Sequence, residues 1–261
     1  MVQAPSRRDR VRAATTEEIK QTARRILVSE GPDAVSLRAI AREMGMTAPA
    51  LYRYFGSHDE LIKHVCADIF TELAGDIRKA IDSATAVTGG DMTAKVMGAC
   101  WEFRRWSLNH PREFGLIFAT PLPGLHVQKD DITAEGGGLF GNTFFELMVE
   151  LWHRHPFPVA GDDEIDPGLR VQLERYREGL GRLAAGLPLG LLMTFLRCWV
   201  RLYGIVSLEV FGHLSFALDD GRPMFELMLS EMAPLVGLEY PLQDASHSHQ
   251  ALHYRCAIFT G

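Results

Sequence analysis

The sequence SLRAIAREMGMTAPALYRYF, residues 36–55, decides the fold. Ser36 is a favourable helix N-cap, and the apolar residues that follow it share one face of a helix: Leu37, Ile40, Ala41 and Met44. Gly45 predicts a tight turn, after which Thr47 begins a second short helix in which Leu51 and Phe55 share one face. The stretch therefore predicts two short helices joined by a turn.

The outward face of the second helix, predicted over residues 47–55, has the chemistry of a nucleic-acid reader. With the two apolar anchors turned inward, small, aromatic and basic side chains point outward: Pro49, Ala50, Tyr52 and Arg53. Small residues let a helix backbone approach base edges, and tyrosine hydroxyls reach phosphate oxygens. These are the requirements of a recognition helix, although Arg53 is read equally well as a solvated helix charge.

Helix signals also flank this stretch on both sides. Two predicted capping boxes pair a Ser or Thr with a Glu three residues later: Thr15 with Glu18, and Ser57 with Glu60. The first begins a helix that Gly31 and Pro32 end, and the second begins a long helix that would join the small unit to the rest of the chain.

The spacing of these residues resembles the tetracycline-repressor (TetR) family of transcriptional regulators. The likeness covers about residues 15–64 and rests on Gly31, residues 36–41, Gly45-Met46, residues 49–55, and Ser57 with Glu60-Leu61. A weaker likeness, to the Trp…His-Gly class of C-terminal domains in this family, lies in Trp199–Glu209, where Tyr203 stands in place of the usual His.

The resemblance implies a three-helix DNA-binding domain, a ligand-binding and dimerising helical C-terminal domain, and DNA affinity that falls when a small effector binds. It implies phosphate contacts by Ser36, Thr47, Tyr52 and Tyr54, base contacts by Arg38, Ala48, Pro49 and Ala50, and further positions beside DNA at Leu37, Arg53 and His58. Two of these depart from the family pattern, because Tyr54 stands where His is common and His58 where Lys is common.

Charge supports the same division of the chain. The 261 residues carry a net charge of −6, which on its own discourages a nucleic-acid partner. Residues 1–64, however, hold 11 Lys and Arg against 8 Asp and Glu, or +3, and the remainder carries −9. A basic unit followed by an acidic one indicates that only the first meets a polyanion.

Targeting and membrane signals are weak. The arginines near the N-terminus precede no apolar run, and the four cysteines, Cys66, Cys100, Cys198 and Cys256, never form a C-x-x-C motif, so reduced core thiols in the cytoplasm are expected. The apolar stretch 187–211 is long enough to cross a bilayer, but it contains Arg197, Arg201 and Glu209, so a buried helix and no membrane partner are expected.

The periodicity elsewhere predicts an all-α fold. Helices are expected over 16–30, 36–44, 47–55, 58–84, 91–109, 112–119, 139–155, 168–185, 188–212 and 222–237, with loops over 121–138 and 156–167. The expected organisation is a flexible basic arm (1–14), a helix-turn-helix DNA-binding domain (15–64), a helical effector-binding and dimerisation domain (65–240) and a flexible tail (241–261).

The larger domain is rich in aromatic residues, most of them expected in the core and a minority around an effector cavity. The candidates for such a cavity are Trp101, Trp106, Phe114, Phe118, Phe145, Trp152, Phe195, Trp199 and Tyr203. The resemblance implies a homodimer through the helices 188–212 and 222–237. Their apolar stripes, Leu192, Phe195, Leu196 and Trp199 with Phe225, Leu229 and Met232, fit either that dimer interface or the core of one chain.

Catalytic, cofactor and metal signals are absent from the sequence. Residues 136–141, GGGLFG, match G-x-G-x-x-G but follow no strand, so a flexible loop is expected there instead of a dinucleotide site. Two H-x-H pairs, His153 with His155 and His247 with His249, are poorly spaced for joint ligation on a helix.

The leading hypothesis is a ligand-responsive, homodimeric repressor in the cytoplasm, associated with the nucleoid, that binds a near-palindromic double-stranded operator. Its effector is unknown, and no cofactor or catalytic residue is expected. The rival is a helical small-molecule-binding protein or enzyme in which the DNA-binding motif is vestigial.

Overall fold

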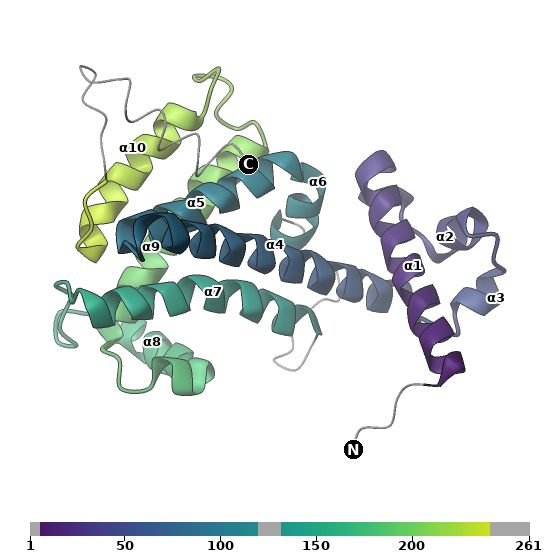
Figure 1. Ribbon diagram of the computed structural model, residues 1–261, viewed down its shortest axis with the longest axis horizontal. Coiled ribbons are helices and arrows are strands. Elements are labelled where there is room, and N and C mark those ends of the chain that lie inside the picture. The colour runs from purple at the N-terminus through teal and green to yellow at the C-terminus, as the bar shows by residue number, and fades with distance from the viewer. Residues whose placement is uncertain (1–5, 120–131, 241–261) are drawn as a thin grey trace. The chain divides into compact units, whose positions relative to one another are not determined.

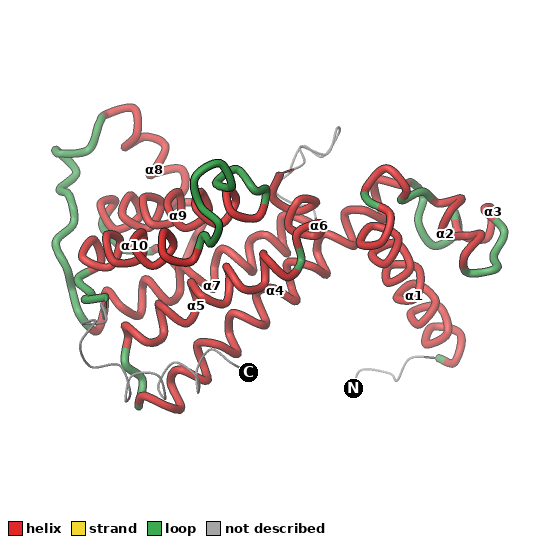
Figure 2. Tube along the Cα trace, turned by 90° about the horizontal axis from the view of Figure 1, so that it is seen from above, coloured by secondary structure: helices red, strands yellow, loops and turns green. Residues whose placement is uncertain are grey.

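The computed structural model describes residues 6–119 and 132–240, and every regular element in these ranges is a helix (Figures 1 and 2). The α-helices are α1 (Arg7–Glu30), α2 (Leu37–Glu43), α3 (Ala48–Leu51), α4 (His58–Thr88), α5 (Met92–Asn109), α6 (Pro111–Phe114), α7 (Ile132–Arg154), α8 (Pro167–Leu180), α9 (Leu189–Val210) and α10 (Arg222–Met232). Short turns are η1 (Pro32–Ala34), η2 (Gly115–Ala119, π-helical), η3 (Gly181–Ala184) and η4 (Ala233–Val236). The all-α prediction is confirmed.

The chain folds into two compact units. The first contains the residues up to Ala74 together with His110–Phe140, and the second contains Gly75–Asn109 and the residues from Gly141 onward. The helices α4 and α7 therefore contribute to both units. The tail predicted over 241–261, with Cys256, His247 and His249, lies outside the described residues, and so do residues 1–5 and most of the predicted loop 121–138.

The start of α1 corrects one prediction. The helix begins at Arg7 and not near residue 16, so residues 7–14 are helical instead of a flexible arm. Its capping box is formed by Ser6 and Asp9, whereas the Thr15 hydroxyl donates to the carbonyl of Val11 inside the helix. Arginine is a good helix former, and an N-cap residue with an acidic partner three positions later was present nine residues upstream of the expected one.

The glycine run of residues 136–141 is also helical, within α7, and is not the predicted loop. A Cβ on Gly136 would lie 3.1 Å from the Ala67 Cα and 3.2 Å from its carbonyl oxygen, so the missing side chain lets α7 approach α4 closely in the first unit. The prediction was wrong because tertiary packing here overrides the poor helix propensity of glycine.

The first unit holds α1 against α4 and α6 by charged contacts as well as by its core. Arg24 of α1 forms ion pairs with Glu72 of α4 and Glu113 of α6, and Arg112 of α6 donates to the carbonyls of Leu27 and Val28 at the end of α1. Beside them four phenylalanine rings pack together: Phe70, Phe114, Phe118 and Phe140.

The second unit is assembled around α9, which packs against α5, α8 and α10. This helix is long and apolar enough to span a membrane by length and composition, and it is the one such helix in the described ranges. Its face toward the core carries Leu192, Phe195 and Val206, while Arg197 and Arg201 are exposed. The helix is therefore buried by the chain on one side, whereas the expectation was a helix buried on most sides; Val200 and Leu208 lie on its exposed side.

A buried ion pair joins α5 to α9. The Arg104 Nε atom lies 2.7 Å from a Glu209 carboxylate oxygen, the guanidinium also donates to the other oxygen, and both side chains are only 12% exposed. The guanidinium also lies 5.6 Å from the ring centroid of Trp101 and 5.3 Å from that of Phe225. Gly221 gives the Glu209 side chain room, because a Cβ there would lie 2.5 Å from its carboxylate.

Replacing Arg104 by Gln is expected to lower the free energy of unfolding by about 3 kcal/mol or more, because it leaves the Glu209 carboxylate buried without its partner. The substitution Arg154→Gln on α7 removes an equal charge whose side chain is 51% exposed, and its partner Glu150 keeps its other ion pair with Lys95, so this variant is expected to cost less than about 1 kcal/mol. Urea unfolding of both variants checks this. Equal losses would contradict the central role of the Arg104–Glu209 pair.

Candidate nucleic-acid interface and ligand cavity

The helix α2 is bounded by two local signals that the sequence contains. The Ser36 hydroxyl accepts a hydrogen bond from the backbone N–H of Ala39 at 3.1 Å, as an N-cap does. At the other end Gly45 has φ +63°, Met46 N–H donates to the carbonyl of Ala41 at 2.8 Å, and Gly45 N–H donates to that of Arg42 at 3.3 Å. This is a Schellman ending, and it turns the chain toward α3.

The helix α3 is a single turn held from inside by two anchors. Leu51 and Phe55 are buried, and the Phe55 ring packs edge-on against His64 of α4 at a centroid distance of 5.4 Å. Residues 52–54 form a turn instead of the helix predicted as far as residue 55. Thr47 occupies the N-cap position, although its side chain makes no capping hydrogen bond.

Most of the predicted DNA-contacting residues lie on the exposed side of α2, α3 and their turns. Tyr52 is 53% exposed. The others on that side are exposed or half-buried: Ser36, Arg38, Thr47, Ala48, Pro49, Ala50, Arg53 and Tyr54. The first unit thus presents hydroxyl, aromatic and guanidinium groups around a short helix of small residues. This is the surface that direct readout and phosphate contact need.

Two predicted contacts have other roles. Leu37 is buried in the core below α2, so its side chain does not belong to the exposed surface. The His58 Nε2 atom lies 2.9 Å from the carbonyl oxygen of Val35, within hydrogen-bonding distance. His58 therefore links the start of α4 to the residue before Ser36. Its side chain is held by this contact and is not free to reach a phosphate in the predicted way. The sequence alone does not show such a tie, because its two partners lie 23 residues apart.

Arg12 is a contact that the sequence reasoning missed. Its guanidinium donates to the carbonyl of Arg53 at 3.0 Å and lies 5.3 Å from the centroid of the Tyr54 ring. The residue belongs to the segment that was expected to be a loose arm. Arg12 links the start of α1 to the turn after α3, and it covers the ring of one residue predicted to hold a phosphate.

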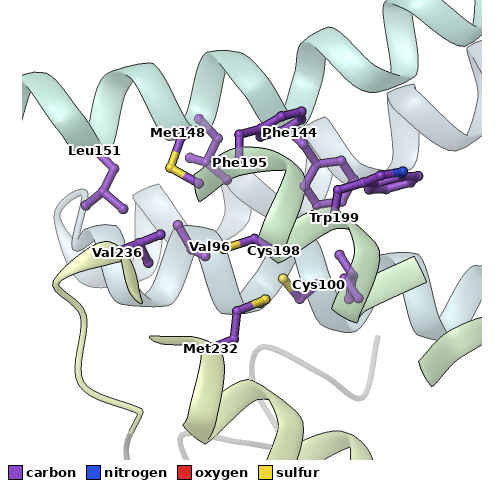
Figure 3. Close-up of a pocket in the computed structure, with 12 residues that line it drawn as sticks. Val96, Cys100, Phe144, Met148, Leu151, Phe195, Cys198, Trp199, Met232 and Val236 are labelled. Carbon is purple, nitrogen blue, oxygen red and sulfur yellow. The ribbon is translucent and has the colours of Figure 1, made fainter. Parts of the chain in front are cut away.

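A cavity of about 50 Å³ lies in the second unit. Figure 3 shows side chains of α5, α7, α9 and the α10 region converging on it. The lining residues are apolar or sulfur-containing: Val96, Cys100, Phe144, Leu147, Met148, Leu151, Phe195, Cys198, Trp199, Leu202, Met232 and Val236. Beyond two thiols and one indole ring, this lining offers a ligand no polar side chain.

Of the nine aromatic candidates, Phe195 and Trp199 line this cavity. Phe145 packs behind Phe195, Tyr203 stacks on Trp199, Trp152 packs on Phe157, Trp101 on Phe225, and Trp106 is fully buried. Phe114 and Phe118 belong to the first unit. The sequence reasoning favoured aromatic rings, but aliphatic and sulfur side chains form most of the wall, and their pattern is that of any core residue.

The cavity's thiols lie in a water-poor environment. Burial raises the pKa of Cys100 to about 12 and that of Cys198 to about 11. In Figure 3 their sulfur atoms lie in the middle of the view, close to that of Met232. Within the described ranges no three His, Cys, Asp or Glu side chains are grouped so that they could hold a metal ion.

The interface and cavity just described coincide with two known domain families. Residues 13–65 match the family described as bacterial regulatory proteins, tetR family, and residues 96–232 match the tetracyclin repressor-like C-terminal domain. The first match covers α2 and α3 and the second covers most of the cavity wall.

Whole-chain relatives agree with these matches. The HTH-type transcriptional regulators Mb1846 of Mycobacterium bovis and Rv1816 of Mycobacterium tuberculosis are each 30% identical over 206 residues, which is 79% of this chain and 84% of theirs. The crystal structure of regulatory protein SCO4313 is 29% identical, with a TM-score of 0.66, over 88% of this chain and 100% of that one.

RolR in complex with resorcinol shares the fold at a TM-score of 0.54 and 15% identity, over 97% of this chain and 96% of that one. The matched families and the curated relatives are transcriptional regulators and not enzymes, which removes the rival reading of an enzyme with a vestigial motif. A helix-turn-helix unit, a helical second unit with an apolar cavity and these relatives lead to one conclusion: the chain belongs to the TetR family of bacterial transcriptional regulators.

Proposed function

We propose that the chain is a repressor that binds a near-palindromic operator as a homodimer and is released from it by a small apolar effector. The observation that carries the proposal is the exposed surface of α2 and α3, where hydroxyl and guanidinium groups surround a short helix of small residues. A dimer would insert one α3 from each protomer into successive major grooves. The protein would act in the cytoplasm, at the nucleoid.

The proposed contacts divide into two kinds. Ser36, Thr47 and Tyr52 hold phosphates through their hydroxyls, and Ser36 can do so because its oxygen accepts the Ala39 N–H while its own hydrogen remains available. Arg38 reads a base edge, and Ala48, Pro49 and Ala50 allow close approach and contact with thymine methyl groups. Arg53 adds a positive charge at the edge of this surface.

The effector is proposed to be small, uncharged and mostly apolar. RolR holds the small aromatic diol resorcinol. The present cavity offers no carboxylate, amide or hydroxyl side chain to such a ligand, so a molecule with fewer polar groups fits better. At about 50 Å³ the cavity is smaller than the apolar cavity of about 150 Å³ that admits benzene in another protein, so an effector of that size would have to widen it by displacing α5, α7, α9 or α10.

The dimer interface is proposed on the outer faces of α9 and α10. The stripes predicted for the interface, from Leu192 to Trp199 and from Phe225 to Met232, face largely inward, since Leu192, Phe195, Phe225, Leu229 and Met232 are buried within the chain. Exposed apolar residues occur instead on other faces of the two helices: Val200 and Leu208 on α9, Met224 and Leu227 on α10. Gly204 lies between the first two and leaves room for a close helix.

Coupling between effector and DNA is proposed to pass along helices that belong to both units. The helix α4 begins at His58, which is bonded to Val35, and continues to Thr88, while α7 runs from Ile132 to Arg154 beside the cavity. An effector can shift DNA affinity only if it binds the DNA-competent and incompetent arrangements with different affinities. Widening of the cavity against α7 would provide such a difference.

Selection of bound sites from a random DNA pool tests the DNA-binding part. We expect a near-palindromic consensus, and we expect Arg38→Ala to lose the preference at one base pair in each half-site. Tyr52→Phe removes one hydroxyl and is expected to weaken all sequences alike by about 0.5–1.5 kcal/mol. A consensus unchanged by Arg38→Ala, or a Tyr52→Phe loss confined to some sequences, would contradict the assigned roles.

Sedimentation of Val200→Glu and Leu227→Glu variants tests the dimer interface. Val200 is 67% and Leu227 49% exposed, so a charge at either position leaves the monomer intact but would be buried without a partner in the dimer. We expect the dimer Kd to rise about a hundredfold or more, since each 1.4 kcal/mol is tenfold. Val171→Glu on α8, at a residue 44% exposed, is the matched control and should leave the dimer unchanged.

Thiol alkylation tests the buried, apolar environment of the two cysteines in the cavity wall. Because burial raises the pKa of Cys100 to about 12 and of Cys198 to about 11, few thiolates are present near neutral pH. We expect both cysteines to react with iodoacetamide roughly two orders of magnitude more slowly in the folded protein than in urea. Peptide mass spectrometry measures the two reaction rates. Equal rates in the two conditions would mean that water reaches these thiols freely.

A further inference from the structure

The helix α1 is longer than the core of the first unit requires. Its buried residues all lie between Ile19 and Leu27, whereas residues 6–14 are exposed throughout. At 1.5 Å per residue, the eight residues from Arg7 to Ala14 extend the helix by about 12 Å beyond that packed part. This segment, residues 7–14, is called the α1 extension below.

Isolated helical turns are marginal in water, so the α1 extension needs support from outside its own backbone. One support is the capping box at its start, in which Asp9 N–H donates to the Ser6 hydroxyl at 3.2 Å and Ser6 N–H donates to the Asp9 carboxylate at 3.2 Å. The other is Arg12, which donates to the carbonyl of Arg53 and covers the Tyr54 ring. Arg12 thus fixes the extension beside the turn that follows α3.

The charge of the α1 extension is strongly one-sided. It carries Arg7, Arg8, Arg10 and Arg12 against Asp9, for a net charge of +3 in eight residues. Arg8 lies one turn before Arg12 on the same helix face, and Arg7 and Arg10 share the opposite side. Like charges at this spacing repel one another and destabilise a helix, so the extension would be stabilised by a polyanion.

The composition of the α1 extension also selects the partner. Val11 is its one large apolar side chain, so no apolar face is available to enter a lipid layer or a protein groove. Guanidinium groups match phosphate oxygens in a forked geometry. Because Arg12 holds the extension next to the proposed recognition helix, a duplex that receives α3 would bring its phosphates to this segment.

We propose that the α1 extension binds the phosphate backbone of DNA beside the groove that receives α3, so that each protomer covers more of the operator than its helix-turn-helix alone. Arg7, Arg8 and Arg10 make these contacts, while Arg12 positions the segment. The inference rests on the proposed DNA-binding function. It assigns binding strength and footprint length to the extension, and no role in reading bases.

The test is the salt dependence of DNA binding by the full chain carrying Arg7→Gln, Arg8→Gln and Arg10→Gln together. Gln keeps helix propensity and polarity while removing charge. Each phosphate contact contributes about 0.9 to the slope of log K against log salt, and the triple variant removes three such contacts in each of the two protomers, so over about 50 to 300 mM salt we expect the slope to shrink by about 5. The selected consensus should stay the same, and the nuclease footprint should shorten at both ends.

A matched triple variant controls for net charge. Arg78→Gln, Arg175→Gln and Arg182→Gln remove three exposed arginines of the second unit and should leave slope and footprint as in the wild type. An unchanged slope in the first triple, or equal reductions in both, would overturn the inference while the wild type still binds its consensus. If the wild type bound no DNA in these conditions, the proposed function itself would fail.

Discussion

The burial of Leu51 and Phe55 is the constraint on which the rest of the DNA-facing structure depends. The helix α3 is one turn long, too short to be stable by itself, and its position comes entirely from contacts with neighbouring elements. The two anchors fix it from inside, the Schellman turn at Gly45 sets its entry, and Arg12 holds the turn that follows it. These few contacts therefore determine where the exposed side chains around Tyr52 lie.

The second unit follows a different rule. Its helices are long, and a buried ion pair with aromatic support lies between two of them: Arg104 with Glu209, beside Trp101 and Phe225. The pair joins α5 to α9, two of the helices whose other faces meet the cavity. A rigid joint on one side and an apolar space on the other suit the effector-binding role proposed above.

The sequence predicted what short-range patterns determine. The caps at Ser36 and Ser57, the turn at Gly45 and the inward face of Leu51 and Phe55 are local signals, and the structure confirms each. Contacts between residues far apart in the chain could not be predicted from the sequence. The close approach of Gly136 to Ala67 makes a helix of a glycine run, His58 bonds to Val35, and Arg12 reaches Arg53, all across gaps in sequence that carry no pattern.

The residues that line the cavity could not be predicted from the sequence either. Residues such as Val96, Leu151 and Cys198 have the periodicity of core residues. A residue that lines a cavity differs from a core residue only in facing an empty space instead of a packed neighbour. The sequence also did not reveal which apolar residues of α9 are exposed, because residues such as Leu192, which pack within the chain, dominate its apolar pattern.

The central claim, sequence-specific DNA recognition by the first unit, is tested most directly by comparing two duplexes of equal length and composition. One is the DNA upstream of the protein's own gene, and the other is the same DNA with its sequence shuffled, both measured by fluorescence anisotropy at physiological salt. The account predicts that the purified protein binds the upstream duplex at least about a thousandfold more tightly. Equal affinity for the two duplexes would contradict it.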